Sequence, residues 1–426
     1  MATPTPGDRS PSHRAPALGG AAAPYDAIAS QARTLAELLI ATRPLWDQRP
    51  FRERPAPWEA DMPEVAVWLR QLDVVSIDAL EGDPCGGPPL PMTLADLRDA
   101  AAAASHVPVW PAAAAITGTT SAPMRGVKGR KQAQIAAFQR AVAAPLDRAA
   151  PRRLVDWCGG KGHLTRALAA RCGCSVCVVD REGALVTAAV VLGAAAGVSV
   201  TGHAADVTTA TPPVALDADA ALVALHACGQ LTDAAVRAAI DREVPWLALV
   251  PCCHHRVPSG GWRPLSNVVR QTGLQLNVNA LRLSIADEGP ATPRARARRR
   301  QEMCWRIGAD LLFATCNEDP TAPPLGVIPR ATYGLSYEAF CTLALAGRGL
   351  VPPRHWRPDA HLREATDATR VVRALSLVRG LLRRSVETLC VLDRGQALVE
   401  AGWRVNVGTF CDPAITPRNL LLIASR

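Results

Sequence analysis

The stretch "LVDWCGGKGHLTRALAA", Leu154 to Ala170, decides the fold of this 426-residue chain. It begins with an apolar run that ends in Asp156 and continues through a turn with three glycines and one lysine. It then passes into residues whose apolar spacing is that of a helix. A strand that leads through a glycine-rich turn into a helix opens a unit of parallel sheet and lets the backbone approach a ligand closely.

The same alternation of short apolar runs and helical segments continues after this stretch. The strand candidates are "RLVDW", "SVCVVD", "VSVTGHAAD", "AALVALHACG" and "WLALVPCC", followed near the end of the chain by Trp403–Phe410 and Asn419–Ser425. This pattern predicts an α/β fold with a doubly wound, mostly parallel, seven-stranded Rossmann-like sheet and helices on both faces. In such a sheet the ligand lies at the carboxyl ends of the strands.

The rest of the chain divides by composition. Residues 1–26 are rich in Pro, Gly, Ala and Ser and predict a disordered leader. Residues 27–119 predict a helical N-terminal extension, and residues 120–426 predict the sheet-containing domain with a helical insertion at about 290–400. Within that insertion, the segment 294–314 predicts a basic helix with a solvated arginine face, packed by Met303, Trp305, Ile307 and Leu311.

Composition points to a protein of the cytoplasm. No window of eighteen residues is apolar and free of charge, so we expect no membrane span. The thirteen cysteines follow no regular spacing and no secretory signal precedes them, so we expect reduced thiols, including core thiols in "CGCSVC", Cys172–Cys177.

The formal net charge of +9 comes almost entirely from arginine. It agrees with Ala/Arg/Pro-rich codon usage and also with an anionic partner such as RNA. No DNA specificity is evident, and nothing in the sequence indicates an oligomeric state.

The glycine turn is tested against three kinds of ligand. A phosphate P-loop has four residues between its first glycine and a Gly-Lys pair that is followed by Ser or Thr. Here Lys161 is followed by Gly162, and no glycine lies at the required distance upstream. A dinucleotide turn would place its third glycine at position 165, which is Thr165, so NAD is the weaker alternative. A turn for S-adenosylmethionine (SAM) needs an acid that pairs with the cofactor's ammonium group, and glycines beside it. Asp156 with Gly159, Gly160 and Gly162 supplies these.

Two further acids support a nucleoside cofactor. Asp180 ends the second strand, where a carboxylate accepts hydrogen bonds from both ribose hydroxyls. Asp206 closes the third strand candidate, where it would accept from the adenine amino group. SAM is therefore the predicted cofactor.

The fourth and fifth strand candidates end in histidines and cysteines that should open onto the same crevice. "HACGQLTD" places His226, Cys228 and Asp233 there, and "CCHHR" places Cys252, Cys253, His254 and His255 there. Zinc is disfavoured because the ligands are consecutive and no spaced second pair follows, so no metal is expected. Two interpretations stay open: these residues shape a pocket as buried thiols and satisfied histidines, or the histidines bind substrate and move protons.

Together, "VDWCGGKGHLTRAL", "ALHACGQLTD", "VPCCHHR" and "TPRNLLLIA" resemble a family of class I SAM-dependent methyltransferases. This family includes the methyltransferase-like 25 proteins and the eukaryotic tRNA 2'-O-ribose methyltransferase that acts on the acceptor stem. "KGRKQAQI", Lys128–Ile135, is similar to the lysine-rich helix start of the family. The resemblance spans about residues 120–426. The zinc-binding segments of the tRNA enzyme have no counterpart here, since no CxxC pair precedes residue 120.

The resemblance implies a role for each matching residue. The cofactor-binding residues would be Asp156, Cys158, Gly159, Gly160, Gly162, Asp180 and Asp206. The residues lining the methyl-transfer pocket would be His226, Cys228, Asp233, Cys253, His254 and His255. Cys158 stands where class I enzymes generally have glycine and agrees with this subgroup.

The expected function is transfer of a methyl group from SAM to an acceptor, with RNA favoured slightly over a protein or a small molecule. A hydroxyl acceptor needs a nearby histidine or lysine as base, whereas a neutral ring nitrogen needs none. The alternative is a non-catalytic SAM-binding domain that serves as an interaction or regulatory module.

Overall fold

The computed structural model describes residues 25–51, 53, 55–110, 127–209, 216–286, 292–317 and 325–426. Most of the expected disordered leader, residues 1–24, lies outside the described residues, as does the expected boundary at residue 119. Helix α1 (Tyr25–Ala41) begins within the last two positions of that leader.

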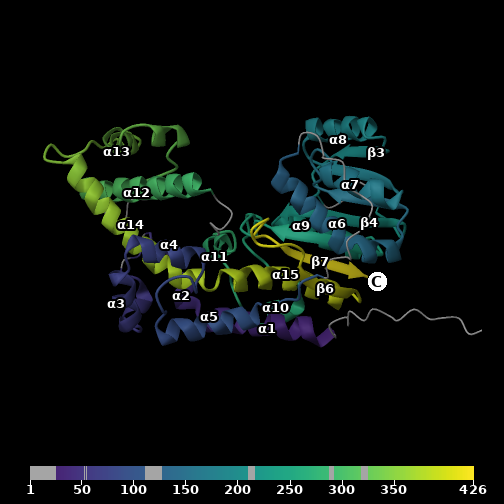
Figure 1. Cartoon of the computed structure of the whole chain (residues 1–426), viewed down its shortest axis with the longest axis horizontal. Helices are drawn as coiled ribbons and strands as arrows, with labels where there is room; N and C mark the ends of the chain where they lie inside the picture. Colours follow the sequence, from purple (N-terminus) through teal and green to yellow (C-terminus); the bar gives the residue numbers. More distant parts are fainter. Residues whose placement is uncertain are drawn as a thin grey trace, which may run out of the picture.

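The sheet has seven strands in the order β3-β2-β1-β4-β5-β7-β6 (Figure 1). The strands are β1 (Arg153–Trp157), β2 (Ser175–Asp180), β3 (Val200–Ala204), β4 (Ala220–Cys228), β5 (Trp246–Cys252), β6 (Arg404–Thr409) and β7 (Leu420–Ser425). Neighbours among β1 to β5 are parallel, and β7 runs antiparallel to both β5 and β6. The predicted doubly wound sheet is confirmed, with the strand order reversing between β1 and β4.

Helices cover both faces because alternate residues of each strand are apolar on opposite sides. One face packs against α6 (Gly129–Ala149), α7 (His163–Cys172) and α8 (Gly183–Ala195). The other packs against α9 (Gln230–Asp241) and α15 (Arg383–Glu400), with α1 lying on α15. Short helices α10 (Asn267–Gln271) and α11 (Val278–Leu283) join this layer.

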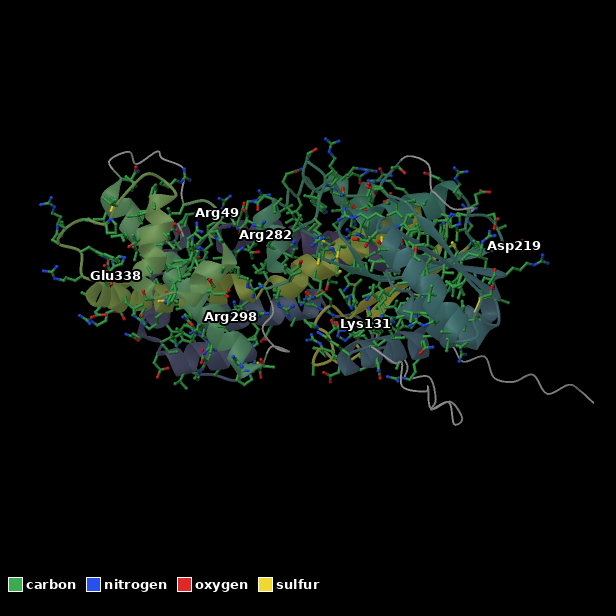
Figure 2. All side chains as sticks on the ribbon, turned by 90° about the horizontal axis from the view of Figure 1, so that it is seen from above. Arg49, Lys131, Asp219, Arg282, Arg298 and Glu338 are labelled. Atoms are coloured by element: carbon green, nitrogen blue, oxygen red, sulfur yellow. A yellow bond between two sulfur atoms is a disulfide. The ribbon has the colours of Figure 1, made fainter. Side chains whose placement is uncertain are left out.

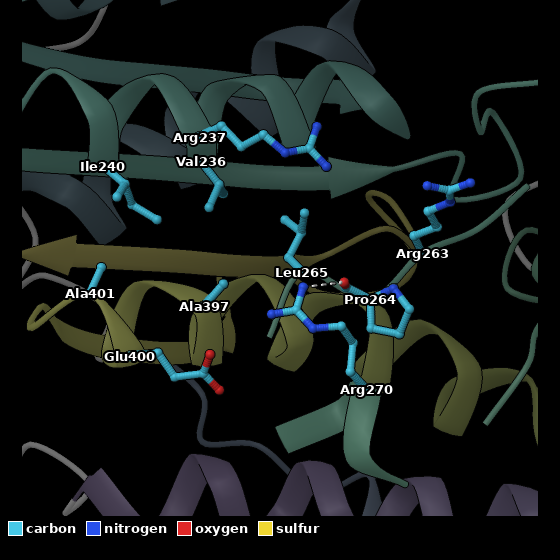
Figure 3. A pocket seen from close by; sticks show the side chains of 10 residues that line it. All are labelled: Val236, Arg237, Ile240, Arg263, Pro264, Leu265, Arg270, Ala397, Glu400 and Ala401. Carbon is cyan, nitrogen blue, oxygen red and sulfur yellow. Dashed lines mark hydrogen bonds between the residues drawn. The ribbon is translucent and has the colours of Figure 1, made fainter. Parts of the chain in front are cut away.

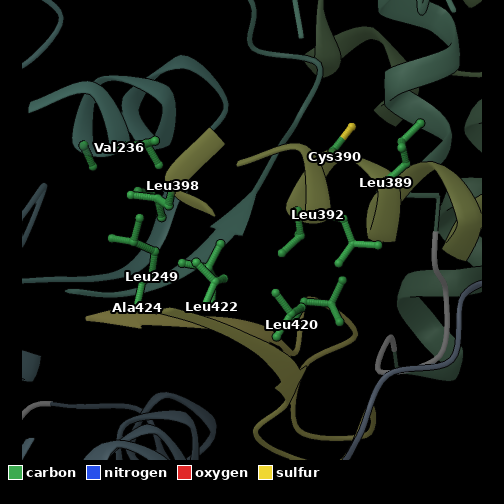
Figure 4. Packing of buried hydrophobic residues seen from close by; sticks show 14 of the residues in the cluster. Val236, Leu249, Leu389, Cys390, Leu392, Leu398, Leu420, Leu422 and Ala424 are labelled. Carbon is green, nitrogen blue, oxygen red and sulfur yellow. The ribbon is translucent and has the colours of Figure 1, made fainter. Parts of the chain in front are cut away.

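Leucines form the contact between α15 and the middle of the sheet. Leu398 and Leu392 of α15 lie over Leu249 of β5 and Leu422 of β7 (Figure 4), and all four are at most 1% exposed. Burial of this area is the main favourable term for attaching α15 to the sheet.

The remaining helices form an arm beside the sheet (Figure 1). They are α2 (Arg43–Trp46), η1 (Pro57–Glu59), α3 (Pro63–Gln71), α4 (Val74–Gly82), α5 (Met92–Ala104), α12 (Pro293–Cys316), η2 (Arg330–Gly334), α13 (Tyr337–Ala346) and α14 (Pro358–Gly380). The apolar side of α14 packs against α3, α4 and η1, and α12 packs against α13 and α14. The N-terminal helices and the late insertion therefore share one core.

Helix α12 forms where the sequence predicts it, but Met303, one of the four residues expected to pack it, is exposed. Ile307 and Trp305 are buried, and Arg298, labelled in Figure 2, is exposed and pairs with Glu302 at 2.8 Å. Arg300 joins α12 to α4 through an ion pair with Asp78 at 2.7 Å.

One expectation about cysteines is wrong. A disulfide joins Cys172 and Cys174, because the turn after α7 brings the two side chains together, and the other eleven cysteines are free. Cys177 is buried in the core as expected. Among the described residues, no helix has both the length and the apolarity needed to cross a bilayer.

Truncation of the central core should destabilise the whole fold. Leu249→Ala removes a fully buried side chain and leaves a cavity, so we expect a loss of about 2–5 kcal/mol in the free energy of unfolding, measured by urea denaturation. Val191→Ala on the exposed side of α8 is the matched control and should change stability by about 0.5 kcal/mol or less. Equal effects of the two variants would contradict the assigned core.

Candidate active site

The turn after β1 is built around a buried carboxylate. Asp156 is 2% exposed and accepts a hydrogen bond from the hydroxyl of Thr165 in α7. A Cβ at Gly159 would lie 2.6 Å from Cγ of Asp156, so only glycine fits there. A dinucleotide turn would have glycine at position 165, but here the Thr165 side chain donates a hydrogen bond to Asp156. Nothing in the local sequence pattern predicts this contact.

The next two glycines of the turn adopt left-handed backbone conformations. Gly160 has φ +55° and donates its N–H to Oδ2 of Asp180 at 3.1 Å. Gly162 has φ +64°, begins α7, and leaves no room for a Cβ, which would lie 2.9 Å from that of Ala189. The turn therefore connects the ends of β1 and β2, as a shared cofactor site requires.

Burial shapes the electrostatics of this turn. It raises the pKa of Asp156 from its ordinary value of 3.8 to about 6, although Thr165 and the charge of Lys131 oppose the shift. Burial lowers the pKa of Lys131 of α6, labelled in Figure 2, and the charges of Asp156 and Cys252 partly oppose this shift. Lys131 lies in the helix start that resembles the family, Lys128–Ile135, but the sequence gives no sign that this side chain acts on the site.

The other expected cofactor residues surround this turn. Asp180 also accepts from the N–H of Glu182 at 3.1 Å. Cys158 has φ +58°, and burial together with the charges of Asp180 and Asp156 raises its pKa to about 12. Asp206 lies two residues beyond the end of β3, is exposed, and accepts from the N–H and hydroxyl of Thr208.

His226 lies at an irregularity in β4. The pairing with β5 shifts register between Leu225 and Ala227, and His226 between them has φ +69°. Its Nε2 lies 3.3 Å from Oε1 of Gln134 on α6. Burial, and then the charge of Lys131, lower the pKa of His226 to about 4, so the ring is neutral at neutral pH.

Three sulfur atoms meet where β4 and β5 end. The Sγ atoms of Cys228, Cys252 and Cys253 all lie within 4.8 Å of one another, with 3.5 Å between the first two. The adjoining backbone is tightly constrained: Gly229 has φ +52°, and a Cβ there would lie 2.2 Å from the carbonyl oxygen of Arg256. Hydrogen bonds from Cys228 and Cys252 lower the pKa of Cys253 to about 2, so this thiol ionises readily.

Two residues expected in the transfer pocket belong instead to a buried ion-pair network. Asp233 pairs with Arg394 of α15 at 2.7 Å, and Nδ1 of His254 lies 3.3 Å from Nη1 of the same arginine. Burial lowers the pKa of His254 well below its usual range. These contacts fix α9, β5 and α15 to one another.

His255 has a more open position than His254. Its pKa is lowered by burial and, less strongly, by Arg282 and Arg256, against the opposing charge of Cys253. The structure thus brings His226, Cys228, Cys253 and His255 to the strand ends beside the glycine turn.

Comparison with known proteins agrees with this geometry. Residues 130–260 match the model of a protein family described as a methyltransferase domain. The chain contains a SAM-dependent methyltransferase domain.

Two solved methyltransferases match this chain at low identity. One is the apo form of the S-adenosylmethionine-dependent methyltransferase SibL, with 23% identity over 26% of this chain and 38% of that chain and a TM-score of 0.21. The other is geranyl diphosphate methyltransferase in complex with GPP and sinefungin, with 16% identity over 53% of this chain and 78% of that chain and a TM-score of 0.22.

The methyltransferase domain has residues suited to each part of SAM. The buried Asp156 carboxylate has no ion pair among the described residues and would gain one from the ammonium group of the cofactor. The backbone of Gly159 to Gly162 allows close approach, and Asp180 at the end of β2 would face the ribose. The site fits the cofactor.

A separate cavity of about 420 Å³ lies where α9, the loop before α10 and the end of α15 meet (Figure 3). The described residues that line it include Arg237, Arg263, Arg270 and Glu400, and none of them belongs to the candidate site. Glu400 accepts from two backbone N–H groups at the start of α10, so this carboxylate serves to join α15 to α10.

SAM binding should depend on pH through Asp156. Its raised pKa means that the carboxylate is charged only above about pH 6, so the Kd for SAM should rise as the pH falls from 7 to 5. Because the folded protein binds this proton more tightly than the unfolded chain does, the raised pKa also stabilises the fold of the cofactor-free protein below about pH 4. This contribution to stability is lost as the pH rises through 6. Calorimetry measures the Kd, and Asp156→Asn should bind weakly with no dependence on pH. A constant Kd for the wild type over this range would refute the assignment.

Cys253 should behave as a thiolate. At a pH below its pKa, an ordinary thiol is alkylated about ten times faster for each unit by which the pH rises, because the fraction of thiolate rises. Cys253, with its lowered pKa, should instead react with iodoacetamide at nearly the same rate from pH 6 to 8.5. Mass spectrometry of the modified peptides gives the rate. Cys228→Ala should slow the reaction at pH 6, because it removes the donor whose hydrogen bond lowers the pKa of Cys253. A tenfold rise in the alkylation rate of wild-type Cys253 for each pH unit would contradict the assigned hydrogen bonds from Cys228 and Cys252.

Proposed function

We propose that this methyltransferase transfers the methyl group of SAM to a hydroxyl oxygen of an RNA. The observation that carries the proposal is Lys131, a partly buried lysine with a lowered pKa whose charge acts both on Asp156 of the cofactor turn and on His226. A hydroxyl must lose its proton during transfer, and a lysine whose pKa is lowered can accept it.

The chemistry divides between the cofactor and the chain. Bound SAM supplies an electrophilic methyl group, and in an in-line displacement the C–S bond breaks as the C–O bond forms. Lys131 would take the proton of the acceptor hydroxyl. Neutral His226, held by Gln134, would orient that hydroxyl, since a ring with a pKa of about 4 is too weakly basic to be the main proton acceptor.

RNA is favoured as acceptor by the charge around His226. Both Arg130 and Arg418 lower the pKa of His226 through their charge. Arg130 is exposed and its Nε donates to the carbonyl oxygen of Ile415 at 2.8 Å, which leaves the rest of the guanidinium free to meet a phosphate. The net charge of +9 and the resemblance to a tRNA ribose methyltransferase support the same class of acceptor.

The acceptor is tested by transfer of labelled methyl from SAM into fractionated cell lysate. We expect label that RNase removes and protease does not. Nuclease digestion followed by chromatography should then place the methyl on a ribose oxygen. Label that survives RNase but not protease would refute RNA, and label on a ring nitrogen would refute the hydroxyl acceptor.

Replacement of the proposed base should affect the chemical step alone. Lys131→Gln should lower kcat by roughly 100-fold or more and remove the rise of rate with pH. The Kd for SAM should change little when it is measured at pH 8.5, where the Asp156 carboxylate is charged with or without Lys131. Lys128→Gln is the matched control, because Lys128 is exposed at the start of the same helix. Full activity of Lys131→Gln would exclude lysine as the base.

A further inference from the structure

A larger cavity, of about 690 Å³, lies outside the cofactor site between α4, α5, α11, α12 and the junction of α14 with α15. Its walls carry six arginines and a single carboxylate, Glu81. The arginines are Arg98, Arg282, Arg373, Arg379, Arg383 and Arg384. Leucines of α4, α5 and α11 form apolar wall between them. The cavity therefore combines strong positive charge with an apolar surface.

Ion pairs within the protein use only some of these arginines. Arg373 pairs with Asp78 and Glu81, Arg384 pairs with Glu387 at 2.7 Å, and Arg98 pairs with Asp99. These contacts fix the walls of the cavity.

Arg282 and Arg379 have no ion pair within the described part of the chain. Arg379 is half-buried; its Nη2 donates to the carbonyl oxygen of Asn279 at 3.5 Å, and its Nε is buried without a hydrogen-bond partner among the described residues. Asp47 and Glu53 act on Arg379 through their charge without forming an ion pair with it. A guanidinium placed in this way costs free energy unless a ligand supplies acceptors, and phosphate oxygens match its geometry.

The cavity adjoins the candidate active site. Arg282, labelled in Figure 2, acts on His255 through its charge. Arg384 donates to the side chain of Asn419 at 3.0 Å, and the preceding Arg418 acts on His226. In Figure 1, α11 lies between the helical arm and the sheet. Arg282 therefore belongs both to the cavity wall and to the charged surroundings of His255 in the candidate active site.

We propose that this cavity binds a nucleotide of the acceptor RNA that neighbours the methylated one, with its phosphate on Arg282 and Arg379 and its base against the leucines. The inference rests on the proposed function and assigns the helical arm to substrate recognition. The volume lies within the range of about 300–1,000 Å³ that is usual for small-molecule sites.

The test measures RNA binding by the full chain. The probe is a fluorescein-labelled, single-stranded RNA of mixed sequence, about twenty nucleotides long, and anisotropy gives its Kd across a range of salt concentrations. Arg282→Ala should raise the Kd roughly tenfold. It should also make the slope of the logarithm of the binding constant against the logarithm of the salt concentration shallower, by about 0.7 for each phosphate contact that is lost. Arg379→Met should act similarly, and Arg148→Ala, on the exposed end of α6, is the control with the same loss of charge.

The outcomes separate this inference from the proposed function. If the wild type methylates RNA but Arg282→Ala and Arg379→Met bind the probe like the control, the cavity assignment is wrong and RNA transfer stands. If the wild type neither binds the probe nor labels RNA, both proposals fail. SAM affinity, measured on each variant, should be unchanged.

Crosslinking supplies a second readout. RNA that contains 4-thiouridine should crosslink to peptides from α5 or α11 under ultraviolet light. Crosslinks confined to the sheet domain would overturn the cavity assignment even if Arg282→Ala weakened binding.

Discussion

The burial of one carboxylate governs the geometry of the site. Asp156 ends a central strand where water cannot reach it, so its neighbours must satisfy it or leave it neutral. Thr165 donates to it, Gly159 leaves it space, and Lys131 offers a nearby charge. The path of the chain from β1 through the turn into α7 brings these groups to the buried carboxylate. The same carboxylate, buried without an ion pair among the described residues, is suited to bind a cationic group.

A second constraint joins the ends of β4 and β5. The carbonyl oxygen of Cys252 accepts from the N–H of Gly229 at 2.8 Å, and the carbonyl oxygen of Arg256 accepts from Gln230 at 2.9 Å. These bonds hold the two motifs in contact and bring three sulfurs together. Arg394 then fixes the same region to α15 through Asp233 and His254. The "CCHHR" segment thus contributes both to the candidate pocket and to the attachment of the last helix.

The helical arm and the sheet are parts of one structure. Helix α15 packs on the sheet along its length, and α1 and α5 pack on α15. The arm therefore has a fixed relation to the strand ends, which is what a recognition element beside an active site needs. In the proposed arrangement, the sheet domain holds the cofactor and the arm contacts the RNA.

The sequence by itself determined the strands, their mostly parallel direction and the glycine turn, because apolar runs that alternate with helical segments and glycine positions are local signals. It also indicated the strand ends that carry Asp180, His226 and Cys253. Only the tertiary structure decided which of these side chains are already engaged. Asp233 and His254 meet Arg394, about 140 residues or more away in sequence, and Thr165 and Lys131 reach Asp156 from two different helices. Such partners come together through packing between distant segments, and no local pattern in the chain specifies them.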